Sequence, residues 1–142
     1  METEIFSLKL VSPLFYIKKD GLNPFSCREE KAFGEQVEKL FCFELDEEHC
    51  MSFESDKGKT LGKLLSCGIA ANERADETII ELPRGDYLFA QKRKILGKEE
   101  IISLAFEIQS EGLWQRLVPG KMLYLRYLFE DGSPVTQLLR PY

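Results

Sequence analysis

The chain has 142 residues, of which 44% are hydrophobic and 30% are charged, and its formal net charge at pH 7 is −5. This length suits one domain with a substantial core. The acidic balance argues against a nucleic-acid-binding surface, because binding to phosphates requires a basic face. No apolar run approaches the roughly 18 residues of a membrane span, and Met1–Ser7 lacks the basic residues of a signal peptide. We therefore expect a cytoplasmic protein that binds neither nucleic acid nor membrane.

The first residues predict two strands. Ile5–Val11 alternates loosely between apolar and polar residues, which is typical of a half-buried strand. Pro13 interrupts this pattern, and Leu14–Lys18 continues it as a second strand or as the same strand beyond a bulge. Turn residues at Asp20-Gly21 then end the extended segment.

A helix is predicted over Cys27–Phe41. Ser26 and Glu29 fit a capping box, in which the two side chains satisfy backbone amides at the start of a helix. Apolar residues then recur at the spacing of one helix face, namely Phe33, Val37, Leu40 and Phe41. Beyond the helix, Cys42–Thr60 could hold one or two short strands. The apolar run Leu64–Ala71 predicts a central strand, because it is too short for a typical helix.

The second half predicts four strands and one helix. Pro83 and Gly85 are placed as in a type II turn over Pro83–Asp86. Lys98–Glu111 carries a buried stripe of apolar residues and is expected to end at Gly112. The predicted strands are Ile79–Leu82, Tyr87–Lys92, Met122–Glu130 and Val135–Leu139, with a hairpin turn at Asp131-Gly132 between the last two.

The two halves of the chain echo each other. PLFYIKKDG (Pro13–Gly21) and DYLFAQKRKILG (Asp86–Gly97) are both short aromatic strands that end in basic residues and a glycine before a predicted helix. The echo predicts one α+β domain, residues 1–142, built from two pseudo-symmetric strand–helix repeats at about 1–71 and 72–142. We expect a mostly antiparallel sheet with two helices on one face and a groove between the repeats.

The sequence offers little for metal or cofactor chemistry. The single histidine, His49, lies in one cluster with Cys42 and Cys50, and the four cysteines show no CxxC spacing. We therefore expect free thiols, no metal and no cofactor. Catalytic residues are not identified, since no nucleophile-elbow glycine pattern is present.

Aromatic residues on or near the repeated units suggest a pocket for a small organic molecule. The aromatic set is Phe15, Tyr16, Phe89, Trp114, Tyr124 and Tyr127, and all of these except Phe15 are predicted ligand contacts. Aromatic residues on strands more often pack in a core, and we expect about half of this set to do only that. Trp114 and Tyr124 are favoured as ligand contacts because each carries a hydrogen-bonding tip.

The stretch IIELPRGDYLFAQ (Ile79–Gln91) resembles the strand–turn–strand signature of the GyrI-like family of small-molecule-binding domains, which also serve as effector domains of MerR- and AraC-type regulators. The matching residues are Glu81, Leu82, Pro83, Gly85 and Tyr87. FYIKKDG (Phe15–Gly21), LWQRLVPG (Leu113–Gly120) and LLRPY (Leu138–Tyr142) are similar to other segments of these domains. The resemblance implies binding of a small organic molecule in the groove between the repeats.

The chain departs from the family at two acidic positions. Family members often carry a glutamate before the tyrosine of the penultimate strand, where this chain has Arg126 beside Tyr127, and Gln137 stands where an acid is also common. An arginine in the groove would favour anionic ligands over cations. Arg126 could equally face solvent or form an ion pair with Glu130 or Glu107.

The resemblance implies a stand-alone sensor or modulator that binds a small organic molecule. The departure at Arg126 and the aromatic candidates lead us to expect that this ligand is anionic or aromatic. Two alternatives stay open. One is a hydrolase of reactive electrophiles, which would need Glu107 or Glu81 to converge with Tyr124 or Tyr127. The other is an inhibitor module that binds a protein partner.

Overall fold

The computed structural model describes residues 5–18, 38–45, 63–70, 78–94, 96–117 and 120–142. These residues form eight strands and one helix. The elements are β1 (Ile5–Leu10), β2 (Leu14–Lys18), β3 (Lys39–Glu44), β4 (Lys63–Ala70), β5 (Ile79–Leu82), β6 (Gly85–Lys92), α2 (Lys98–Trp114), β7 (Met122–Glu130) and β8 (Ser133–Pro141).

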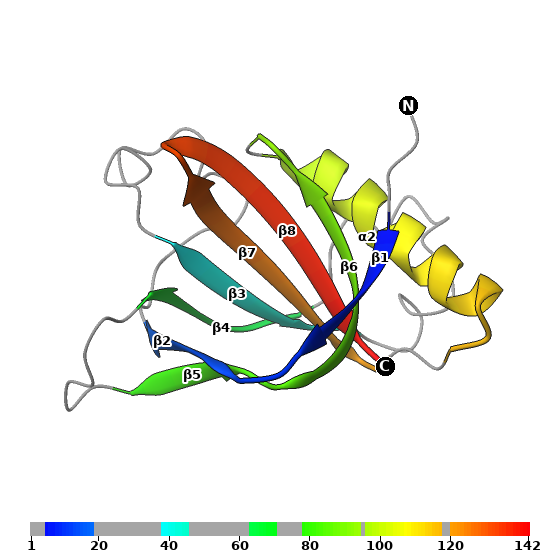
Figure 1. The fold of residues 1–142 in the computed structure, drawn as a ribbon, viewed down its shortest axis with the longest axis horizontal. Helices are drawn as coiled ribbons and strands as arrows, with labels where there is room; N and C mark the ends of the chain where they lie inside the picture. The colour runs from blue at the N-terminus through cyan, green and yellow to red at the C-terminus, as the bar shows by residue number, and fades with distance from the viewer. Residues whose placement is uncertain (1–4, 19–37, 46–62, 71–77, 95, 118–119) are drawn as a thin grey trace.

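All eight strands belong to one strongly curved sheet (Figure 1). The order is β1-β6-β8-β7-β3-β4-β2-β5, and all neighbouring strands are antiparallel. The β7–β8 connection is the tight turn that the sequence predicts. Asp131 and Gly132 have φ angles of 51° and 81°, and positive φ at both central residues is the requirement of a type I′ hairpin.

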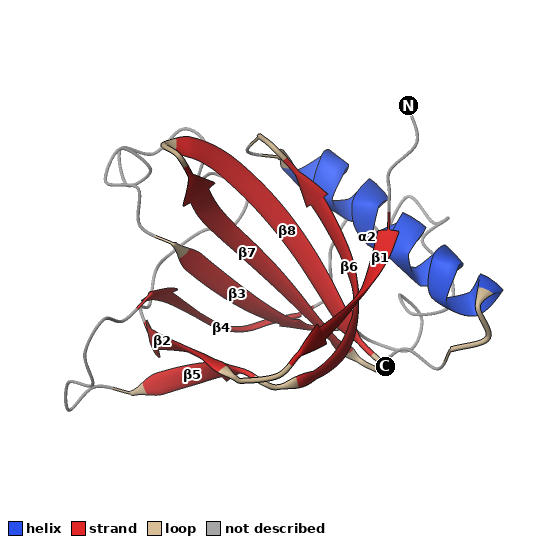
Figure 2. Ribbon diagram, in the orientation of Figure 1, coloured by secondary structure: helices blue, strands red, loops and turns tan. Residues whose placement is uncertain are grey.

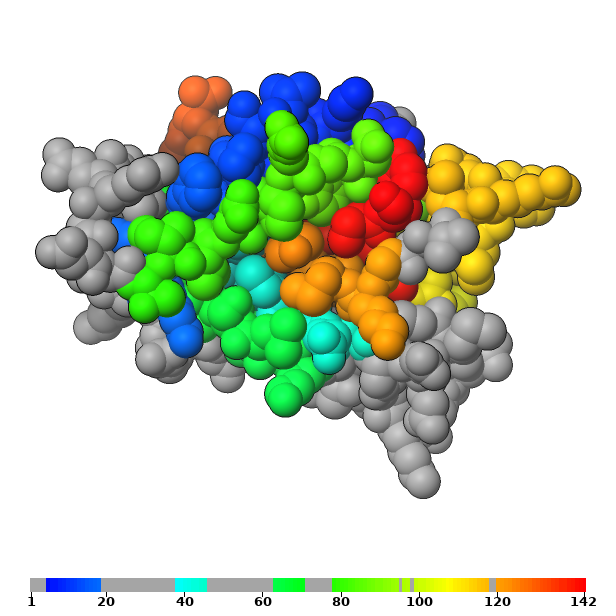
Figure 3. All heavy atoms as spheres, turned by 90° about the horizontal axis from the view of Figure 1, so that it is seen from below, coloured from blue at the N-terminus to red at the C-terminus, as the bar shows by residue number. Residues whose placement is uncertain are grey.

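The two ends of the strand order are linked through the chain. Only Val11–Pro13 separates β1 from β2, and only Pro83-Arg84 separates β5 from β6. Leu10 pairs with Gly85 and Leu14 pairs with Leu82, so these are two long bent strands that run side by side (Figure 3). Since β2 also pairs with β4 and β6 also pairs with β8, backbone pairing continues around a ring.

The curvature gives the sheet two different faces. The inner face carries a buried cluster that includes Tyr16, Leu40, Tyr87, Tyr124 and Leu139. The outer face packs against α2 through a larger cluster, to which the helix contributes Ile101, Leu104, Ala105 and Ile108 (Figure 2). Alternation along each strand therefore assigns its residues to one face or the other.

Polar contacts fix α2 on the outer face. The buried Arg140 of β8 donates from Nη1 to Gln109 Oε1 of the helix at 2.7 Å. Thr136 Oγ1 donates to Lys94 O at 2.7 Å and accepts from Leu96 N at 3.3 Å. Two backbone groups of the β6–α2 connection, Lys94 O and Leu96 N, are thus bonded to β8.

The predicted fold class is wrong in its helices. The described residues contain one helix, whereas two on one face were expected. Leu40 and Phe41, assigned to the first helix, lie in β3, where five of the six residues are buried. A strand that is buried on both faces reads as a continuous apolar run, which has no period of two to distinguish it from a helix. Residues 27–37 of that predicted helix lie outside the described residues.

The predicted strand–helix unit is described only in the second half, as β6 followed by α2. In the first half β2 is described, but residues 27–37 of the matching helix are not, and β3 already begins at Lys39. The second predicted helix is present, but it continues through Gly112 to Trp114.

Most predicted strands are confirmed. Strands β2, β5 and β7 have the predicted bounds, and the run at 64–71 is β4, which is central between β3 and β2. Gly85 has a positive φ, as predicted, but its value of 148° differs from the roughly 80° of a type II turn. No helix in the described part of the chain is long and apolar enough to cross a membrane.

Candidate binding site on the inner face of the sheet

Arg126 is the centre of a polar network on the inner face. It lies at the middle of β7, and its side chain is 18% exposed. Its Nε donates to Tyr16 Oη at 2.8 Å and to Glu38 Oε2 at 3.1 Å. Its Nη2 donates to the same carboxylate oxygen at 2.9 Å, and its Nη1 donates to Gln137 Oε1 at 2.9 Å. The guanidinium therefore bridges both sides of the ring.

Tyr16 and Glu38 form one side of this network. Tyr16 is on β2, across the ring from Arg126, and its hydroxyl donates to Glu38 Oε2. Glu38 immediately precedes β3, and its carbonyl accepts from Ala70 N of β4 at 2.9 Å. This backbone bond holds the carboxylate beside the tyrosine.

Two glutamines extend the network along the sheet. Gln137 is directly opposite Arg126 in the β7–β8 ladder, and Gln91 is directly opposite Gln137 in the β6–β8 ladder. Gln137 Nε2 donates to Gln91 Oε1 at 2.8 Å. We name these five residues, Tyr16, Glu38, Gln91, Arg126 and Gln137, the Arg126 network.

Burial and charge both act on the titrating groups of the network. Burial raises the pKa of Tyr16, the Arg126 charge opposes that rise, and the hydrogen bond to Glu38 supports it. Burial by itself would lower the pKa of Arg126, but Tyr16 and Glu38 raise it, and the net shift is upward. The network therefore consists of a charged guanidinium, its carboxylate partner and a neutral phenol.

The network has unused hydrogen-bonding capacity. A guanidinium has five N–H donors, and the bonds above use Nε, one N–H of Nη1 and one of Nη2. Two donors of Arg126 therefore have no acceptor among the described residues. All contacts to the Glu38 carboxylate from this part of the chain go to Oε2, so Oε1 is an unused acceptor. Since the Glu38 side chain is 26% exposed, a ligand could reach these atoms.

Aromatic side chains continue the inner face beside the network. Tyr124 and Tyr87 meet edge to face, with ring centroids 6.1 Å apart, and Tyr87 Oη donates to Pro83 O. Burial raises the pKa of Tyr124, with Cys42 and Glu81 adding to the rise. Phe89 is partly buried against the same cluster. The inner face thus combines a polar centre with an aromatic wall.

Five of the seven sequence-predicted ligand contacts lie together on this face: Tyr16, Phe89, Tyr124, Arg126 and Gln137. The other two lie elsewhere. Tyr127 is fully buried in the outer-face core, where it meets Phe41 edge to face. Trp114 ends α2 and is 83% exposed.

Two members of the Arg126 network were missed. Glu38 was hidden by the prediction of a helix, in which it would have been an ordinary polar position. Gln91 could have been found, because it follows Phe89 by two residues and therefore shares its face of β6. The two partners considered for Arg126, Glu130 and Glu107, are both wrong, since its ion pair is with Glu38 at 2.9 Å.

The residues weighed for metal binding and catalysis are only partly described. Cys42 is buried on the inner face and Cys67 on the outer face, and neither forms a disulfide among the described residues. His49, Cys27 and Cys50 lie outside the described residues. The described residues hold no group of three or more metal-ligating side chains. Of the predicted acid–tyrosine pairs, Glu81 is near enough to Tyr124 to affect its pKa, whereas Glu107 lies on α2.

No family model matches the chain, and no curated protein is significantly similar to it. The resemblance to the GyrI-like family stays a prediction, and the two helices predicted from the echo between the halves are not both found among the described residues. Any functional argument must therefore come from the residues themselves.

Proposed function

We propose that this protein binds a small, neutral organic molecule on the inner face of the sheet, as a sensor or modulator. One observation carries the proposal. The Arg126 network presents two unused N–H donors and one unused carboxylate oxygen within a single cluster. A buried network that left nothing for a ligand would use all of this capacity internally.

The charge of the network favours a neutral ligand. The sequence suggested that Arg126 would attract anions, but Glu38 lies against the guanidinium and compensates its charge. The Glu38 carboxylate would repel an anionic ligand, and the Arg126 guanidinium would repel a cationic one. A neutral group with an acceptor beside a donor, such as a primary amide, satisfies both.

The aromatic wall suits the rest of such a molecule. Phe89 is only partly buried against the cluster that contains Tyr124, so its ring can contact an aromatic body. Binding would also have a consequence for the fold, because the network joins residues of β2, β6, β7 and β8 to the start of β3. A ligand that changed the Arg126–Glu38 contact would alter how these strands are held together, which is what a sensor requires.

The test compares three isosteric probes by ligand-detected NMR: benzamide, benzoate and benzamidine. We expect benzamide to bind most tightly, and the variant Arg126→Met to bind it about tenfold more weakly, since a hydrogen bond to a charged group is worth about 1.5–3 kcal/mol. Arg93→Gln is the matched control, because Arg93 forms its ion pair with Glu130 on the surface and takes no part in the Arg126 network. Tighter binding of benzoate or benzamidine, or an unchanged affinity in Arg126→Met, would refute the proposal.

A further inference from the structure

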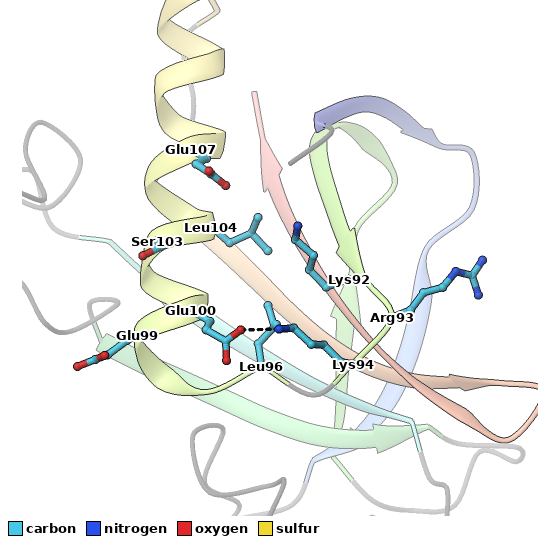
Figure 4. A pocket seen from close by; sticks show the side chains of 9 residues that line it. All are labelled: Lys92, Arg93, Lys94, Leu96, Glu99, Glu100, Ser103, Leu104 and Glu107. Carbon is cyan, nitrogen blue, oxygen red and sulfur yellow. Dashed lines mark ion pairs between the residues drawn. The ribbon is translucent and has the colours of Figure 1, made fainter. Parts of the chain in front are cut away.

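A second site lies on the opposite face of the sheet, between α2 and the end of β6. The structure contains a pocket of 590 Å³ there, within the size range of small-molecule sites. Figure 4 shows its walls, one formed by the first half of α2 and the other by the end of β6. The lining residues that matter here are Lys92, Lys94, Leu96, Glu100, Leu104 and Glu107. This site shares no residue with the Arg126 network.

The base of the pocket is apolar and well fixed. Leu96 and Leu104 are 3% and 2% exposed, so they belong to the core and present only an edge to the pocket. Leu96 is held by the bond from its backbone amide to Thr136 Oγ1. The same hydroxyl holds Lys94 O, so the floor of the pocket is not a loose surface.

The charges around this floor are only partly paired. Lys94 pairs with Glu100 at 3.0 Å across the mouth of the pocket, as the dashed line in Figure 4 shows. Lys92 and Glu107 form no ion pair within the described part of the chain, although both side chains point into the pocket, with Leu104 between them (Figure 4). A cation and an anion therefore face one pocket from two elements without neutralising each other.

We propose that this pocket binds a small zwitterion with an aliphatic side chain, such as a free α-amino acid. The carboxylate of the ligand pairs with Lys92, its ammonium group pairs with Glu107, and its side chain covers Leu96 and Leu104. Both charged groups of the ligand are attached to the same α-carbon, and its side chain replaces water over the apolar floor. A ligand with only one charge leaves either Lys92 or Glu107 without a partner, which reduces its affinity.

The probe is L-leucine, titrated into ¹⁵N-labelled full-length protein and followed by the amide shifts of β6 and α2. L-leucinamide lacks the carboxylate, and N-acetyl-L-leucine lacks the ammonium group. We expect L-leucine to shift the amides around Lys92 and Glu107 and to bind about tenfold more tightly than either analogue. Equal binding of the three compounds, or no shift at these positions, would overturn the proposal without affecting the inner-face site.

Charge-neutralising variants identify the two contacts. Lys92→Gln should weaken L-leucine about tenfold and leave L-leucinamide unchanged, whereas Glu107→Gln should weaken L-leucine and leave N-acetyl-L-leucine unchanged. Glu99→Gln is the matched control, because Glu99 also lines the pocket but points away from it in Figure 4. A control variant that loses as much affinity as Lys92→Gln would show a general charge effect and refute the assignment. The wild-type comparison of the three compounds decides the question if a variant folds poorly.

Discussion

Gly68 illustrates how a single residue position is fixed by packing. It lies on β4, directly opposite Lys18 of β2. A Cβ atom at this position would be 2.5 Å from the backbone oxygen of Ile17 and 3.0 Å from Cδ1 of Ile80. Because a backbone atom cannot rotate away as a side chain can, any larger residue must separate β2 from β4. The absence of a side chain is therefore what lets the ring close here.

We predict that Gly68→Ala lowers the free energy of unfolding by about 1–3 kcal/mol, the usual range for an overpacked position. Gly120→Ala is the matched control, since its added Cβ would meet nothing closer than 3.5 Å, and we expect a change within about 0.5 kcal/mol. Urea denaturation of the three proteins measures both values. A Gly68→Ala protein as stable as the wild type would show that β2 and β4 are not held this closely.

At the scale of elements, Thr136 connects three parts of the structure. Its hydroxyl on β8 bonds to Lys94 O and Leu96 N, which lie between β6 and α2. Since Thr136 is fully buried and Leu96 is 3% exposed, the Leu96 amide has no water to replace the hydroxyl.

We predict that Thr136→Val costs about 1–3 kcal/mol of stability, the penalty for leaving buried polar groups unsatisfied. Thr136→Ser, which retains the hydroxyl, should cost less. Hydrogen exchange of the Leu96 amide gives a local readout and should accelerate in Thr136→Val. If Thr136→Val is more stable than Thr136→Ser, the hydroxyl does not hold the helix in place.

The elements also show what a sequence can predict. Strands β5 and β7 were predicted with their observed bounds, because local turn chemistry sets their limits, whereas β8 extends two residues beyond its predicted bounds at each end. Strand β3 was not predicted, because burial on both faces removed the alternation that identifies a strand. Leu40 and Phe41 were therefore assigned to the end of a helix, although they lie in β3.

The residues of the candidate site could also be predicted only in part. Arg126 and Gln137 were predicted from a family comparison, and Tyr16, Phe89 and Tyr124 from their aromatic character. Nothing in the sequence indicates that Glu38 is the ion-pair partner of a residue 88 positions away, because that contact depends on how the whole ring closes.

At the scale of the whole molecule, buried tyrosines should make the fold sensitive to alkali. Burial raises the pKa of Tyr87 to about 12, and it also raises those of Tyr16 and Tyr124. An unfolded chain loses these protons near pH 10, whereas the folded protein retains them to higher pH. Above about pH 10, deprotonation therefore favours the unfolded state.

We predict that the free energy of unfolding has its full tyrosine contribution below pH 10 and falls as the pH rises from about 10 towards 12. Tyr87→Phe should be less stable near pH 8, because it loses the hydrogen bond to Pro83 O, but its stability should fall less steeply above pH 10. Urea denaturation at several pH values measures both slopes. Parallel slopes for the two proteins would show that Tyr87 titrates normally in the folded state.

The position of β6 also determines how the molecule would respond to mechanical force. Strand β1 lies on one side of β6 and β8 on the other, and both are antiparallel to it. Ile5 is opposite Ala90, near one end of β6, and Pro141 is opposite Tyr87, near the other end. A pull applied between Ile5 and Pro141 would therefore act along the strands and load all the hydrogen bonds of both ladders at once. In this direction the two ladders are loaded in shear and resist extension together. A force that pulled β1 sideways from β6, beginning at Leu10, would instead break the bonds one by one.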